Sequence, residues 1–224
     1  MKFENTDVYN FKNAIRGMRL PMNSNDKSDS KYLTLDEADG DFGHLTFKDY
    51  IIGDNDLDLM QRLVKAGTPH DKFMRQIFVS VDITAPLTWW KQMDQYKVGT
   101  TTNSQSTMHR ISSKPITLDC FETTDYEEIT FGVGEILSPH MIIEYCEKLR
   151  QKYLETKDKK YWRELVRWLP ESWLQTRTWT ANYEVLRNIV HQRAGHKLSE
   201  WQSFIDWVDT LPYADELIFY KGEN

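Results

Sequence analysis

The sequence predicts an α+β fold with mostly helical content. Several segments carry apolar residues at helical spacing between recognisable start and stop signals. One segment, residues 76–83, alternates apolar and polar residues, as a strand with one buried face does. No internal repeat or low-complexity tract divides the 224 residues, so we expect a single domain over residues 1–224.

The first part of the chain is predicted to contain two helices joined by a polar loop. A short helix is expected over residues 6–17, where apolar side chains recur at helical spacing. Residues 20–53 are polar and loop-like, and they form either a lid or a plain connection. The apolar stripe of residues 57–66 predicts a second helix, for which Asp54 or Asp56 is the expected N-cap.

The strand over residues 76–83 is followed at once by a helix. Pro86 suits the first turn of a helix, where its missing N–H is not needed. Trp89 and Trp90 are expected on the buried side; adjacent tryptophans usually belong to a core or a subunit interface and less often form a stacking platform for a ring. The helix cannot run far past Lys97, because a glycine and three threonines with poor helical propensity follow.

The middle of the chain starts irregular and then becomes helical. Residues 111–134 carry a weak pattern that allows one or two short strands. Ser138 is the expected cap of a clear helix whose first residue is Pro139. A charged turn and a second amphipathic helix ending at Pro170 follow, which together predict a helical hairpin.

The C-terminal part predicts an extended segment and two further helices. Residues 173–182 are rich in Thr and Trp and fit a strand or an extended turn. Asn182 is expected to cap the next helix, which Gly195 ends. Ser199 and Gln202 fit a capping box at the start of the last helix.

Composition and charge exclude several classes of protein. The formal net charge of −6 argues against general nucleic-acid or anionic-membrane binding, which relies on broad basic surfaces. Cys120 and Cys146 have no histidine nearby in a ligand-like pattern, so we expect two free thiols, with Cys146 buried, and no metal site. No stretch approaches the roughly 20 apolar residues of a spanning helix, and no signal-peptide core is visible. We therefore expect a cytoplasmic protein without a membrane partner.

The tract from Thr84 to Arg110 is the strongest functional signal. It runs from an aromatic helical segment into a polar stretch dense in hydrogen-bonding groups, which suits a phosphate, a ribose or a base. A solvated surface loop is the alternative interpretation. The main candidate residues combine a cation, an amide, a hydroxyl and an imidazole: Lys97, Asn103, Ser106 and His109.

Other charged clusters have plainer explanations. Arg193 lies with His191 and His196 around a predicted helix end, where cations interact favourably with the helix dipole. The cluster of His70, Asp71, Lys72 and Arg75 is expected to be surface charge, and Arg19 is expected to be solvated. A Gly-rich phosphate loop, a nucleophile elbow and a zinc-protease motif are all missing from the sequence, which disfavours several common enzyme classes.

Two blocks of the sequence resemble the flavin-dependent (alternative) thymidylate synthases. Members of that family carry a strand, Ala-Pro, a helix with a Gln and a motif of the form RHRxxSxNExSxRY. This chain has FVSVDITAP, LTWWKQMD and QYKVGTTTNSQSTMHR in that order, with Asn103 and Ser106 on the motif's Asn and second Ser. The family's later LP, WTxN and Arg elements correspond to residues 169–170, residues 179–182 and Arg193.

The resemblance implies a fold of helices packed around a small antiparallel sheet, assembled as a homotetramer with shared active sites. It also implies a reaction. A methylene carbon passes from methylenetetrahydrofolate to dUMP and is reduced by hydride from an FAD that NADPH has reduced, giving dTMP. The cofactor would supply the difficult chemistry, which agrees with the lack of a visible nucleophile or metal constellation.

The same resemblance assigns roles to individual residues. Those expected in the flavin site are Lys97, Asn103 and Ser106. Those expected to contact the pyrimidine nucleotide are Arg193, Arg177, Arg110 and Ser106. Those expected to be catalytic are Arg193, Lys97 and His109, although His109 is either a proton donor or structural.

The departures from the family motif leave two hypotheses. The family's Arg-His-Arg is Gln95-Tyr96-Lys97 here, so only Lys97 keeps a positive charge, and Arg110 or His109 could substitute. The first hypothesis is a divergent FAD-dependent thymidylate synthase, with normal, altered or lost activity. The alternative is a non-catalytic nucleotide-binding or oligomeric interaction protein.

Overall fold

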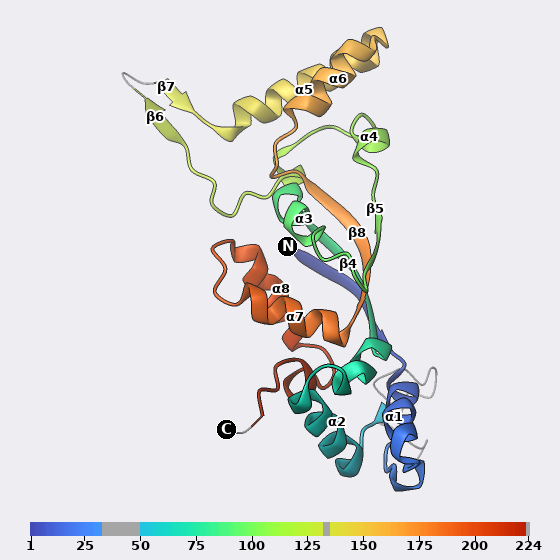
Figure 1. Cartoon of the computed structure of the whole chain (residues 1–224). Helices are drawn as coiled ribbons and strands as arrows, with labels where there is room; N and C mark the ends of the chain where they lie inside the picture. Colours follow the sequence, from blue (N-terminus) through green and yellow to red (C-terminus); the bar gives the residue numbers. More distant parts are fainter. Residues whose placement is uncertain (33–49, 132–134, 223–224) are drawn as a thin grey trace, which may run out of the picture. The chain divides into compact units, whose positions relative to one another are not determined.

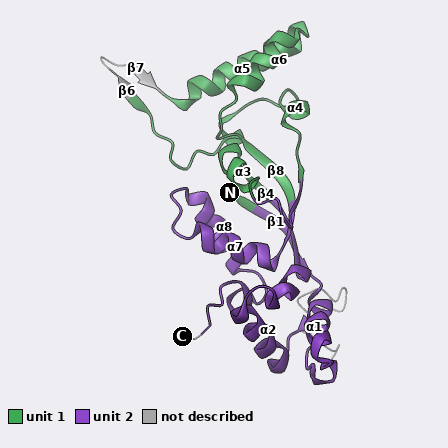
Figure 2. Cartoon of the chain, in the orientation of Figure 1, with its two compact units in different colours: residues 1–2, 83–95, 103–178 green, residues 3–82, 96–102, 179–224 purple. Residues whose placement is uncertain are grey.

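The computed structural model describes residues 1–32, 50–131 and 135–222 (Figure 1). The chain forms two compact units, each assembled from separate stretches of sequence (Figure 2). Unit 1 comprises residues 1–2, 83–95 and 103–178, and unit 2 comprises residues 3–82, 96–102 and 179–224. The expectation of one domain over residues 1–224 stays a prediction.

Four strands form the main sheet, in the order β1-β4-β8-β5. Two side-chain hydrogen bonds show that β4 and β8 run antiparallel. Ser80 pairs with Thr180 at 3.1 Å, and Thr84 pairs with Thr176 at 2.7 Å, so residue numbers rise along one strand as they fall along the other. The strands are β1 (Lys2–Tyr9), β4 (Phe78–Pro86), β8 (Leu174–Asn182) and β5 (Thr101–Ser104). The α+β class with helices and a small antiparallel sheet is confirmed.

The strand predicted from alternation is β4. Its side chains are buried at every second position, at Val79, Val81 and Ile83, as a strand with one face in a core requires. The strand ends at Pro86, which is the N-cap residue of α3 (Leu87–Met93). Trp89 and Trp90 are both buried on this short helix, as predicted.

Unit 2 packs its helices around an aromatic-rich core. Its α-helices in the described part are α1 (Phe11–Arg19), α2 (Asp54–Ala66), α7 (Tyr183–Arg193) and α8 (Ser199–Asp209). Shorter elements are the 3-10 turns Leu20–Met22, Asn25–Lys27 and His70–Gln76, the π-helix Ala214–Ile218, and the paired strands β2 (Lys31–Tyr32) and β3 (Tyr50–Ile51). Fully buried side chains from these helices include Phe11, Met60, Tyr183, Trp201 and Phe204. Part of the lid-or-loop segment, residues 33–49, lies outside the described residues.

The helix predicted over residues 6–17 is wrong at its start. The segment up to Tyr9 belongs to β1, and α1 begins only at Phe11. Asn10 joins the two with a left-handed φ of 82°, a conformation that asparagine tolerates better than most residues. Val8 is buried from the strand while Ile15 is buried from the helix. Their spacing imitates one helix although two elements supply it.

The predicted caps of two helices are also wrong. The N-cap residue of α2 is Gly53, and the first turn is capped by Asp29, whose carboxylate accepts the N–H groups of Asn55 at 2.9 Å and Asp56 at 3.1 Å. A Cβ at Gly53 would lie 2.2 Å from Asp29 Cγ, so this close approach requires glycine. Helix α8 begins at Ser199 with no side-chain cap, so the capping box does not form.

Asp56 is instead the buried partner of several groups in unit 2. Its side chain is 0% exposed and forms an ion pair with Arg19, which is itself buried rather than solvated. Ser28 and Ser30 each donate a hydroxyl hydrogen bond to Asp56 Oδ2 at 2.6 Å. Burial raises the pKa of Asp56, but these hydrogen bonds outweigh burial and leave its pKa below the usual value. Asp56 therefore fixes residues 28–30 to α1 and α2.

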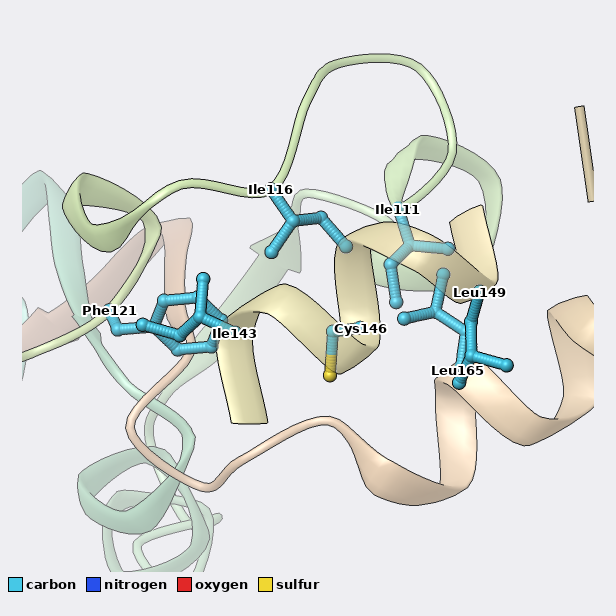
Figure 3. Packing of buried hydrophobic residues seen from close by; sticks show 7 residues of the cluster. All are labelled: Ile111, Ile116, Phe121, Ile143, Cys146, Leu149 and Leu165. Carbon is cyan, nitrogen blue, oxygen red and sulfur yellow. The ribbon is translucent and has the colours of Figure 1, made fainter. Parts of the chain in front are cut away.

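Unit 1 contains the predicted helical hairpin. It is formed by α5 (Pro139–Thr156) and α6 (Lys159–Trp168), and Ser138 caps α5 as expected by accepting the His140 N–H. Figure 3 shows the buried cluster that joins the hairpin to the segment before it. Its members are Ile111, Ile116, Phe121, Ile143, Cys146, Leu149 and Leu165. Both cysteines are free and Cys146 is buried, as predicted.

The remaining elements of unit 1 are short. They are α4 (Thr107–Arg110), the 3-10 turn Leu118–Cys120 and the antiparallel strands β6 (Ile129–Phe131) and β7 (Glu135–Leu137). The short strand β6 agrees with the weak pattern seen over residues 111–134, of which 132–134 lie outside the described residues. Across the described parts of the chain, every helix is too short or too polar to cross a lipid bilayer.

Glu147 on α5 holds the segment before the hairpin against the helix. Its carboxylate accepts the Ile116 N–H at 2.8 Å and two hydrogen bonds from the Arg150 guanidinium, each at 2.7 Å. Arg150 also donates to the Ser112 carbonyl at 3.3 Å. The hydrogen bonds from Arg150 lower the pKa of Glu147 from 4.5 to about 2.

Replacing Glu147 by glutamine is expected to weaken the pH dependence of stability. Because the folded-state pKa lies below the unfolded value, Glu147 stabilises the fold fully above pH 4.5 and loses this contribution as the pH falls towards 2. We expect Glu147→Gln to lower the free energy of unfolding at neutral pH by about 2 to 3 kcal/mol. Urea denaturation between pH 7 and acidic pH would measure this difference.

Glu144→Gln is the matched control for that variant. Glu144 lies on the same helix, but its ion pair with Lys148 is largely exposed, so its removal should change little. If Glu147→Gln retained the pH profile of the unchanged protein, the assigned role of Glu147 would be incorrect.

Candidate functional site

The polar tract after α3 ends in a short capped helix in unit 1. Ser106 caps α4: its hydroxyl accepts the His109 N–H at 3.3 Å and lies 2.8 Å from His109 Nδ1. Asn103 is exposed on β5. The structure thus brings Ser106 and His109 together. The Nδ1 atom of the imidazole can either donate a proton to the Ser106 hydroxyl in a hydrogen bond or accept one from it.

Gln175 fixes this tract to β8. Its side-chain amide donates to the Gln105 carbonyl at 2.8 Å and to Thr107 Oγ1 at 3.0 Å. The backbone adds a further link, from the Gln105 N–H to the Thr176 carbonyl at 2.9 Å. Sequence reasoning missed Gln175, because a polar residue in a Thr-rich strand suggests a solvated position rather than a buried anchor.

Arg177 contacts three residues of unit 1, to which it also belongs. Its Nε donates to Gln175 Oε1 at 2.8 Å, and a terminal nitrogen contacts Asp94 Oδ1 at 2.7 Å. The guanidinium carbon lies 4.2 Å from the ring centroid of Trp90, and only 14% of the side chain is exposed. An anionic ligand would therefore have to compete with Asp94 for this arginine. The role of Arg177 in nucleotide binding stays a prediction.

A cavity of about 410 Å³ in unit 1 is lined by two of the predicted site residues, Ser106 and Arg110. Its size falls within the usual range for small-molecule sites. The other polar and charged lining residues are Lys2, Thr84, Gln105, Thr107, Ser113, Lys114, Asp119 and Glu122. Its apolar wall includes Ile111, Pro115, Phe121, Trp173 and Leu174. The cavity therefore combines cations, two carboxylates and hydroxyls with aromatic surface.

The charge of this cavity favours an anionic group on its basic side. Arg110 and Lys114 are exposed, and neither side chain forms an ion pair with any described residue. Burial raises the pKa of Glu122, but hydrogen bonds from Thr124 and Thr123 outweigh burial and lower it, so this carboxylate is ionised and already engaged. Lys114 was missed by sequence reasoning because it lies beyond the polar tract from Thr84 to Arg110.

Arg193 belongs to a separate cluster in unit 2. Its Nε donates to the Tyr96 hydroxyl at 2.8 Å. Its guanidinium carbon lies 4.4 Å from the Trp201 ring centroid and 5.3 Å from that of Tyr96. Lys97 follows Tyr96, but its exposed side chain forms no ion pair with a described residue. Proximity to the helix end therefore describes only part of the environment of Arg193.

The neighbouring basic residues are engaged with backbone or surface groups. Arg187 donates to the carbonyls of three residues near the C-terminus, Leu217, Ile218 and Tyr220. The Nδ1 atoms of His191 and His196 lie within hydrogen-bond distance of the Arg187 carbonyl and the Leu198 N–H, respectively. Arg75 pairs with Glu184. Among the described residues no group of three or more His, Cys, Asp or Glu side chains is placed to hold a metal ion.

The fold resembles solved structures over almost its whole length. A flavin-dependent thymidylate synthase ThyX from Helicobacter pylori, complexed with FAD and dUMP, superposes with a TM-score of 0.65 at 15% sequence identity, covering 99% of this chain and 98% of that one. The chain has the ThyX fold. A second structure of Thymidylate Synthase X (ThyX) from the same organism, also with FAD and dUMP, gives a TM-score of 0.63 at 15% identity and the same coverage. No family model matches the chain, and no curated protein matches it in sequence.

Proposed function

We propose that this chain is a ThyX-like protein that binds FAD and dUMP and converts dUMP to dTMP. The observation that carries the proposal is the fold, which 99% of this chain shares with a ThyX structure that contains both FAD and dUMP. Two local matches support it: Asn103 and Ser106 at the motif spacing, and the Trp-Thr-Ala-Asn segment with Arg193 after it. A shared fold can host different functions, whereas these residues lie at positions that bind the ligands in the resembling family.

The residues present fit such ligands on chemical grounds. In unit 1, Arg110 and Lys114 offer cations to a phosphate, and Ser106 and Thr107 offer hydroxyls beside them. By the resemblance, Asn103, Ser106 and Lys97 would hold the flavin, which supplies hydride when reduced. Arg193 would recognise the pyrimidine nucleotide, since its planar guanidinium can donate two hydrogen bonds to one ligand.

The remaining parts of the proposal follow from the same resemblance. Methylenetetrahydrofolate would donate the carbon, and NADPH would reduce the flavin. His109 is proposed to hold a proton at Nδ1, next to the Ser106 hydroxyl. We also propose a homotetramer in the cytoplasm, with active sites shared between subunits.

The decisive experiment measures binding of the two ligands. The purified protein is incubated with FAD and desalted, and dUMP is then titrated by calorimetry with and without FAD. Retention of the yellow flavin chromophore and saturable heat from dUMP are expected. A colourless protein that gives no heat with dUMP would refute the proposal.

A second candidate is a nucleotide-binding protein without catalysis. It is favoured by Gln95-Tyr96-Lys97 in place of Arg-His-Arg, because lost arginines weaken the stabilisation of developing charge. An assay of dTMP formation with methylenetetrahydrofolate and NADPH distinguishes the two. Ligand binding without product would support the non-catalytic candidate.

A further inference from the structure

The hydroxyl of Tyr96 forms a directed link to Arg193 in unit 2. The Tyr96 O–H donates to Gln192 Oε1 at 3.2 Å, so its oxygen presents a lone pair to the Arg193 Nε–H at 2.8 Å. Gln192 and Arg193 are consecutive at the end of α7. The phenol therefore contacts two neighbouring side chains, accepting from one and donating to the other.

The turn that carries Tyr96 packs closely against the start of α7. Gly99 has a left-handed φ of 75°, and a Cβ there would lie 3.0 Å from Asn182 Nδ2 and 3.1 Å from Val185 Cγ2. Thr100 closes the turn by donating its hydroxyl to the Tyr96 carbonyl at 2.5 Å. The turn that carries Tyr96 thus lies close to the start of α7, and the Tyr96 hydroxyl contacts the end of the same helix at Gln192 and Arg193.

Trp201 supplies the second restraint on Arg193. Its fully buried ring lies 4.4 Å from the guanidinium carbon, and its centroid is 6.1 Å from that of Tyr96 in an edge-to-face arrangement. One edge of the guanidinium is thus fixed by the Tyr96 hydroxyl, and one face is fixed by an indole. An unrestrained arginine side chain would lose rotamer entropy when a ligand ordered it, so prior restraint favours ligand binding.

We propose that Tyr96 is a positioning residue that orients the Arg193 guanidinium for nucleotide recognition. This inference rests on the proposed function, because it assigns Arg193 to the nucleotide. Tyr96 stands where the resembling family has the central His of Arg-His-Arg. The exchange thus has a specific consequence in this chain: a phenol at this place restrains the arginine through Nε.

A double-mutant cycle tests the inference through the dissociation constant for dUMP. Calorimetry is performed on the full chain loaded with FAD, for the unchanged protein, Tyr96→Phe, Arg193→Lys and the double variant. Tyr96→Phe keeps the ring and should weaken dUMP binding about tenfold, as expected for loss of a hydrogen bond to a charged group. The Arg193→Lys variant lacks the guanidinium Nε–H that donates to the Tyr96 hydroxyl. In that background Tyr96→Phe should therefore have no further effect on dUMP binding.

Tyr145→Phe is the matched control, since Tyr145 lies on α5 in unit 1 and is 43% exposed. It should leave dUMP binding unchanged. An equal loss from Tyr96→Phe in both backgrounds, or no loss in either, would overturn the positioning role while dUMP binding by the unchanged protein upheld the proposed function. Failure of the unchanged protein to bind dUMP would overturn both.

Discussion

Replacing Asp56 by asparagine is expected to lower the free energy of unfolding by about 3 to 5 kcal/mol. Asp56 is 0% exposed and is the anion opposite the buried guanidinium of Arg19. The amide would leave this cation without a charged partner and would place an N–H₂ group among the donors from Ser28 and Ser30. Urea denaturation followed by far-UV circular dichroism measures the effect.

Asp58→Asn is the control for this variant on the same helix. Asp58 pairs with Arg62, but both side chains are about two-thirds exposed, at 66% and 67%, so its loss should change little. Equal stability of the two variants would show that Asp56 is not a central anchor of unit 2. Because the pKa of Asp56 is lowered, its contribution should be present at neutral pH and be lost as the pH falls through the folded-state pKa.

Removing Arg110 and Lys114 from the unit 1 cavity is the second change with a large expected effect. The double variant Arg110→Ala, Lys114→Ala should weaken dUMP binding about a hundredfold, because a phosphate would lose two charge-assisted contacts. These cations are exposed and form no ion pair with described residues, so folding should tolerate their loss. Calorimetry with dUMP gives the affinity, and thermal unfolding verifies the fold.

Lys148→Ala, Lys152→Ala is the charge-matched control. It removes two exposed lysines from α5, where they pair with Glu144 and Glu155, and it changes the net charge by the same amount. If both double variants bound dUMP equally, the cavity would not hold the phosphate. The binding deficit of Arg110→Ala, Lys114→Ala should also shrink as salt rises, since screening weakens these contacts in the unchanged protein.

The sequence was most informative where structure depends on near neighbours. Ser138 and Asn182 were predicted as caps, and each accepts an N–H within the next three residues. The alternation of β4 and the helical hairpin were also predicted correctly, because residue spacing determines which face is buried.

Interactions between distant segments were not predictable from the sequence. Asp56 is of a residue type that often caps a helix N-terminus, but its hydrogen-bond partners are 26 to 37 residues away in the sequence. The first turn of α2 is capped by Asp29 instead. Arg19 was expected in solvent for the same reason. Within the candidate site, the tract from Thr84 to Arg110 led to Ser106 and Arg110, whereas Gln175 and Lys114 reach the same region from outside that tract.

The two cysteines provide chemically distinct positions for labelling. Cys146 is fully buried in the hairpin core, where burial raises the pKa of its thiol and suppresses the reactive thiolate. Cys120 is partly exposed and lines the unit 1 cavity. The natural chain thus carries one accessible thiol at the wall of its candidate ligand site. A fluorophore attached there would report on ligand occupancy without any engineered cysteine.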